Sequence, residues 1–83
     1  MDNTFLKNSQ KMYKILNDVK PTKITNQQLL DYHRKTHMLY SGNTARTLIN
    51  KAFINHIVDL HDSFVTEILK RGMKHNTPLK KLT

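Results

Sequence analysis

The sequence predicts a small all-α protein, a compact bundle of about three helices with a long third helix and a basic C-terminal tail. Apolar residues recur at helical spacing through most of the chain, and no alternation typical of β-strands runs long enough to build a sheet. The 2 Gly and 2 Pro residues stand where helical segments should end. The 83 residues form one domain, 1–83, whose thin core needs help from helix packing, a ligand or a partner.

The first helix is predicted over about 3–19. Pro21 ends this segment, because a proline disfavours helical geometry at the residue before it. The apolar stripe that should face the core recurs at helical spacing and consists of Phe5, Met12, Leu16 and Val19.

The second helix is predicted over about 25–41. Thr25 and Gln28 have the spacing of a capping box, in which the hydroxyl and the side-chain amide each satisfy a backbone N–H of the first turn. Gly42 is expected to stop this helix.

The third helix is predicted over about 44–71, with Thr44 as its N-cap. Basic residues followed by Gly72 form a strong stop signal at its end. A break near Asp59–Asp62 stays open, because aspartate is a poor mid-helix residue. Met73 should pack back on the last turn, and the tail, 74–83, should be extended or mobile.

The charge of the chain favours a polyanionic partner. Fourteen Lys+Arg against six Asp+Glu give a formal net charge of +8, and nucleic acid is the leading candidate, with DNA favoured over RNA. Tyr32 and Tyr40 lie among basic residues and are candidates for stacking on unpaired bases. The residues expected to bind nucleic acid are Arg34, Lys35, His33, His37, Lys70, Arg71, Lys74 and His75.

Composition excludes several function classes. The absence of cysteine excludes thiolate catalysis, cysteine-based zinc fingers and a disulfide framework. No run of about 20 apolar residues predicts a membrane span, so no membrane partner is expected. The N-terminal sequence lacks the pattern of a signal peptide, which predicts an intracellular location, in the cytoplasm or with the nucleoid or nucleus.

Five histidines raise the question of a metal site. His33 and His37 have the i, i+4 spacing that lets two imidazoles bind one zinc ion, and His56, His61 and Asp59 are candidates to complete such a site. Because cationic residues lie between His33 and His37, a structural or surface role is favoured, and no metal or cofactor is expected. Asp59 and Asp62 are expected to balance nearby histidine and lysine residues.

Two stretches, Leu29–Lys35 and Leu60–Leu79, resemble the endonuclease V-type pyrimidine dimer DNA glycosylases and their short relatives. The family pattern is a leucine pair before an Arg-Glu pair, then a helix with a glutamate four residues before Arg-Gly, followed by His and Thr-Pro-Leu. The resemblance implies a compact helical fold and recognition of flipped-out bases, with Arg34 carried over as a DNA-contacting residue. Lys35 stands where the glycosylases carry their catalytic carboxylate, so no catalytic residue is assigned.

Three functions therefore stay open. The first is a small, non-catalytic nucleic-acid-binding protein on a glycosylase-like scaffold. The second is a minimal DNA repair glycosylase and abasic-site lyase, whose amine would come from the N-terminus or from a lysine such as Lys35. The third is a viral or phage-type interaction module, as a homo-oligomer or bound to a partner protein.

Overall fold

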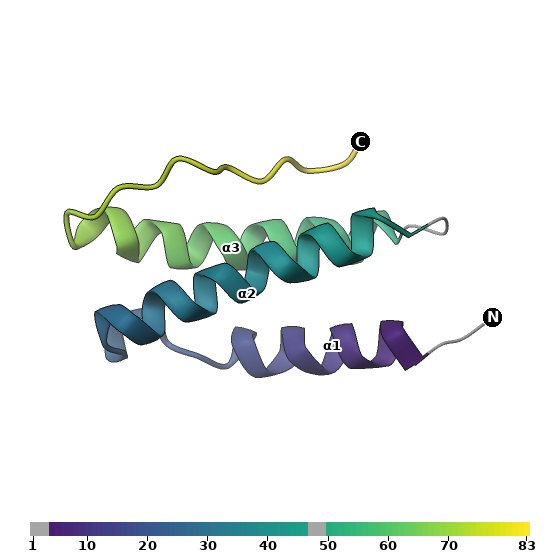
Figure 1. Cartoon of the computed structure of the whole chain (residues 1–83), viewed down its shortest axis with the longest axis horizontal. Coiled ribbons are helices and arrows are strands. Elements are labelled where there is room, and N and C mark those ends of the chain that lie inside the picture. The colour runs from purple at the N-terminus through teal and green to yellow at the C-terminus, as the bar shows by residue number, and fades with distance from the viewer. Residues whose placement is uncertain (1–3, 47–49) are drawn as a thin grey trace.

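The computed structural model describes residues 4–46 and 50–83, which form an all-α bundle. Helix α1 spans Thr4–Asn17, a short 3-10 turn η1 spans Pro21–Lys23, α2 spans Asn26–Thr44 and α3 spans Lys51–Lys70. Consecutive helices run antiparallel, with α2 between α1 and α3, and the tail returns along α3 (Figure 1). The all-α prediction is confirmed.

The first turn of α2 has the predicted capping box. The Thr25 hydroxyl accepts a hydrogen bond from the Gln28 backbone N–H, and the Gln28 side chain accepts one from the Thr25 N–H. Both bonds satisfy donors that an uncapped helix would leave without a partner. This cap therefore fixes where α2 begins.

The boundary between the second and third helices differs from the prediction. Helix α2 continues through Gly42 and ends at Thr44, so Thr44 is no N-cap; Asn50 caps α3 by accepting from the Phe53 N–H at 3.0 Å. Gly42 serves helix packing here, because a Cβ atom at this position would lie 3.2 Å from the Phe5 ring. Residues 47–49 of the predicted third helix lie outside the described residues, as does residue 3 of the predicted first.

The core lies where α2 packs against α3, and α1 closes one side. Its central ring is Phe64, which is fully buried and stacks on Tyr32 with ring centroids 6.1 Å apart. Burying each such side chain stabilises the fold by about 1.5–3 kcal/mol. The core cluster consists of Leu16, Leu29, Leu39, Phe53, Ile57, Leu60, Phe64 and Ile68.

Helix α3 is continuous through Asp59 and Asp62 and ends in the predicted way. Gly72 adopts φ +78°, a left-handed conformation that glycine reaches without a Cβ penalty. The Met73 N–H then bonds to the Ile68 carbonyl at 3.1 Å, and the Met73 side chain packs against the core as predicted. This turn sends the chain back along α3 (Figure 1).

The tail is extended, as predicted, and side chains of the helices hold its backbone. Asn55 on α3 both donates to the Leu82 carbonyl, at 3.0 Å, and accepts from the Leu82 N–H, at 2.7 Å. The Tyr40 hydroxyl donates to the Lys80 carbonyl at 2.8 Å. Among residues 4–46 and 50–83, no helix is long and apolar enough to cross a lipid bilayer.

Candidate metal centre

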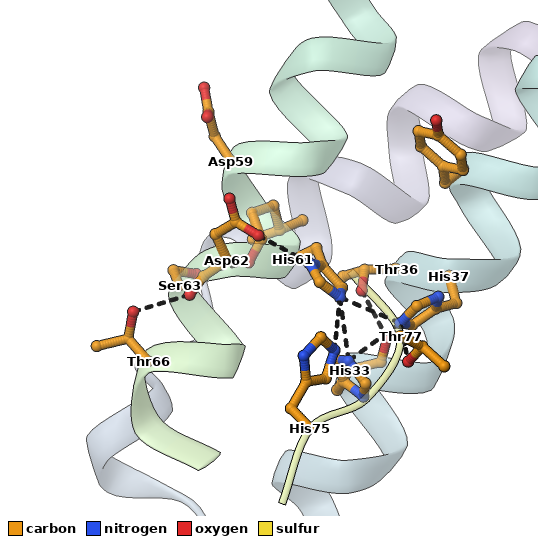
Figure 2. Close-up of polar contacts among 12 residues, drawn as sticks. His33, Thr36, His37, Asp59, His61, Asp62, Ser63, Thr66, His75 and Thr77 are labelled. Atoms are coloured by element: carbon orange, nitrogen blue, oxygen red, sulfur yellow. Dashed lines mark hydrogen bonds and ion pairs between the residues drawn. The ribbon is translucent and has the colours of Figure 1, made fainter. Parts of the chain in front are cut away.

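Four histidines from three parts of the chain converge beside the core (Figure 2). His33 and His37 lie one turn apart on α2, and His61 comes from the middle of α3. His75 comes from the extended tail, three residues after the Gly72 turn that reverses the chain. His61 is 1% exposed, and the other three are half-buried.

The four imidazoles present the same atom to one another. The Nε2 atom of His61 lies 3.2 Å from that of His33, 3.1 Å from that of His37 and 3.2 Å from that of His75. The Nε2 atoms of His33 and His37 are 3.1 Å apart. Four ligand atoms, one from each ring, all lie within 4.8 Å of one another.

Hydrogen bonding among the rings does not account for this convergence. A neutral imidazole has either one proton or one lone pair at Nε2, so Nε2 of His61 cannot form a full hydrogen bond to each of the three Nε2 atoms around it. In a tetrahedral zinc site with Zn–N distances of about 2.0–2.1 Å, neighbouring nitrogens lie about 3.3–3.4 Å apart. Four of the six Nε2 separations are 3.1–3.2 Å, which is close to that geometry.

The environment of His33, His37 and His61 lowers their pKa and so favours the neutral form that a metal requires. Burial, followed by the neighbouring histidines, lowers the pKa of His33 from 6.5 to about 4. Burial is also the main cause that lowers the pKa of His37. For His61, burial lowers the pKa and outweighs the opposite effect of the adjacent Asp62 carboxylate.

A polar group beside the cluster orients one of the rings. The His61 Nδ1–H donates to a carboxylate oxygen of Asp62 at 2.9 Å, which leaves the lone pair of the neutral ring on Nε2, facing the other histidines (Figure 2). A carboxylate in this position is a common outer partner of metal-binding histidines. The Thr77 hydroxyl lies 3.3 Å from Nε2 of His37, so a second group of the tail reaches the same cluster.

The sequence pattern correctly placed His33 and His37 next to each other, but it did not predict the full cluster. It named His61 only as one of several candidates beside His56 and Asp59, and it assigned His75 to a basic surface. His56 is exposed and contacts Tyr13, and Asp59 pairs with Lys81 at 2.8 Å. The Gly72 stop was the available signal for His75, because it turns the following residues back toward α3.

The structure separates the residues predicted to bind nucleic acid into two groups. His33, His37 and His75 direct Nε2 toward the cluster (Figure 2). Arg34, Lys70 and Lys74 are exposed, and Arg34 has a 3.7 Å ion pair with Asp31. Lys35 is half-buried, with its ammonium 5.5 Å from the Tyr32 ring centroid.

Arg71 belongs with the inward-facing residues. Its guanidinium donates to the carboxylate of Glu67, four residues earlier, at 2.8 Å. It also donates to the Asn26 side chain and to the carbonyls of Pro21 and Ile24, at 2.8–3.0 Å. Arg71 therefore ties the end of α3 to the segment before α2.

Comparisons of the chain with protein-family models, with curated proteins and with solved structures found no match. The histidine cluster is thus characterised by its own geometry: four nitrogen donors and one oriented outer carboxylate, at Asp62. Such a donor set suits a transition metal ion rather than Mg²⁺ or Ca²⁺, which prefer oxygen ligands.

Proposed function

We propose that this protein binds one divalent transition metal ion, with Zn²⁺ as the first candidate, through Nε2 of His33, His37, His61 and His75. The observation that carries the proposal is the convergence of these four atoms from two helices and the tail. Because the four donors occupy all the positions of a tetrahedral ion, the role we assign to the metal is structural.

Zinc fits this donor set better than other common ions. Imidazole nitrogen is a good ligand for zinc, copper and nickel, so ligand type alone does not select among them. Copper(II) and nickel(II) favour square-planar or tetragonal arrangements, whereas Zn²⁺ takes a tetrahedron. The three separations of 3.1–3.2 Å among His33, His37 and His61 support the tetrahedral ion, because a square plane would make one of them much longer.

A structural metal answers the stability problem that the chain length poses. A domain of 83 residues without cysteine has a thin core and no disulfide. An ion held by α2, α3 and the tail would link segments that are distant in sequence, and its binding free energy would add to the free energy of unfolding.

Metal analysis of the purified protein tests this proposal. After dialysis against Zn²⁺ and removal of free metal, we expect about one equivalent of zinc per chain. His61→Ala should abolish stoichiometric binding, whereas His56→Ala is a matched control that removes a histidine outside the cluster and should retain it. Zinc contents that are equally low in the wild type and in His61→Ala would contradict the proposal.

Nucleic-acid binding is the second candidate function, and the exposed positive charge favours it. The formal charge is +8, and among the described residues 12 of the 14 lysines and arginines are exposed. The resemblance of Leu29–Leu79 to DNA glycosylases supports the same proposal. Because phosphate contacts would dominate, affinity should fall steeply as salt increases.

Fluorescence anisotropy with labelled duplex, single-stranded and abasic-site DNA tests the second candidate. Binding that hardly changes between low and physiological salt would exclude a phosphate-dominated interface. Arg34→Ala should weaken binding, and Arg46→Ala is a control of equal charge at an exposed position beyond the end of α2. Borohydride trapping on the abasic duplex distinguishes the glycosylase and lyase alternative from non-catalytic binding, because only an amine nucleophile leaves a covalent adduct.

A further inference from the structure

The four proposed ligands differ in how the fold holds them. His33, His37 and His61 lie on the two helices that pack against each other to form the core. His75 is the only one of the four on a segment without helical structure. It points toward the other three rings from the returning tail (Figure 2).

The three helical histidines already form a complete triangle. Their Nε2 atoms are separated by 3.1, 3.1 and 3.2 Å. His61 is buried, and the Asp62 carboxylate orients its ring, so this ligand is preorganised by groups that do not belong to the tail. A metal ion bound to these three nitrogens therefore needs no contribution from the tail, residues 74–83, to stay in place.

The tail, in contrast, is held by contacts that are exposed or half-buried. They include the hydrogen bonds between the tail backbone and the side chains of Tyr40 and Asn55, the bond from Lys51 to the Thr83 carbonyl and the exposed Lys81–Asp59 pair. Each contributes little net free energy, and docking orders a chain that would otherwise be free. Undocking of the tail thus costs less than unfolding of α2 or α3.

We propose that His75 is a displaceable fourth ligand, and that undocking of the tail leaves a three-histidine metal centre whose open position binds water or a small anion. This inference rests on the metal site proposed above. Three histidines with one open position are the arrangement that catalytic zinc sites keep, whereas four protein ligands close a site. Undocking also moves Thr77 away from His37, because Thr77 and His75 both belong to the tail.

Cobalt and azide provide the probes for this open position. Co²⁺ replaces zinc as a coloured ion, and azide is a small anion that changes the visible absorption only when it reaches the metal. We expect azide to leave the spectrum of the Co²⁺-loaded wild-type protein nearly unchanged and to shift that of His75→Ala. The apparent azide dissociation constant should be at least about tenfold lower in His75→Ala. His56→Ala should behave like the wild type.

A second variant keeps all four histidines. Asn55→Ala combined with Tyr40→Phe removes the hydrogen bonds that these side chains make to Leu82 and Lys80. We expect this double variant to retain Co²⁺ and to bind azide more tightly than the wild type, because the tail undocks more often. Azide binding equal to that of the wild type would contradict a displaceable ligand, even if His75→Ala failed to fold.

The outcomes separate this inference from the metal site itself. A wild-type protein that does not bind Co²⁺ overturns both. If the wild type binds Co²⁺ but His75→Ala loses it as completely as His61→Ala does, the metal site stands and His75 is an obligatory structural ligand. Retention of Co²⁺ in His75→Ala, with an affinity at least about tenfold above that of His61→Ala, supports the inference.

Discussion

Replacing Arg71 with alanine is expected to destabilise the fold strongly. The guanidinium bonds to the Glu67 carboxylate, to two backbone carbonyls between α1 and α2 and to the Asn26 side chain at the start of α2. Truncation therefore removes a link between the end of α3 and the start of α2, and it leaves Glu67 as a carboxylate without its cation.

The burial of the pair sets the expected size of the effect. The side chain of Arg71 is 19% exposed and that of Glu67 is 13% exposed. Breaking a fully buried ion pair costs about 3–5 kcal/mol, and the residual solvent contact here reduces this to about 2–4 kcal/mol. For a domain of this size, such a loss lowers Tm by at least about 8 °C.

Chemical and thermal unfolding followed by circular dichroism measure this loss. Lys81→Ala is the matched control, because it also breaks a lysine or arginine ion pair at 2.8 Å, yet both partners are exposed. We expect its Tm to stay close to that of the wild type. A double-mutant cycle with Glu67→Ala isolates the pair, since the double variant should lose less than the sum of the two single variants.

Two results would refute this reasoning about Arg71. One is a free energy of unfolding within about 1 kcal/mol of the wild type, which would mean that the hydrogen bonds contribute little. The other is unchanged unfolding together with a specific loss of nucleic-acid affinity, which would place the guanidinium in a binding surface instead of in the fold.

Three further outcomes follow from the structure. Thr25→Ala removes the capping box of α2 and should lower the free energy of unfolding in urea by about 1 kcal/mol. Thr22→Ala, at an exposed position before the helix, should leave it unchanged. Equal effects of the two variants would contradict the cap. In metal-free protein, the pKa of folded His33 is about 4, below its ordinary value of 6.5. Between these two pH values the unfolded chain binds more protons than the folded one, so the urea midpoint should fall as the pH drops from 7 to 4. A pH-independent midpoint would be inconsistent with burial of this neutral ring. Zinc at 100 times its dissociation constant should add about 2.7 kcal/mol to the free energy of unfolding and raise Tm, and His61→Ala should show no such rise.

The predicted and observed pairing of acidic residues agree. Asp59 and Asp62 were expected to balance nearby lysine and histidine, and they contact Lys81 and His61. Asp62 does more than balance charge, because its carboxylate fixes which nitrogen of His61 faces the other rings. Its position next to His61 in the sequence did not reveal this role.

Local signals in the sequence were sufficient for the class of fold and for several element ends. Helical periodicity, the Thr25–Gln28 capping box and the Gly72 stop depend on residues within one or two turns of each other, and all three have the expected structure. Gly42 shows the limit of such rules. A glycine that locally favours a helix end lies inside α2, at a position where a Cβ atom would come within 3.2 Å of the Phe5 ring.

The histidine cluster was decided by the tertiary structure. The i, i+4 spacing of His33 and His37 was visible in the sequence, and it placed two rings on one face of a helix. Whether His61 meets them depends on the register between α2 and α3, and His75 arrives only because the chain turns back at Gly72. Periodicity identifies which residues share a face of one helix, but the approach of residues 14 or 28 positions apart depends on how whole elements pack.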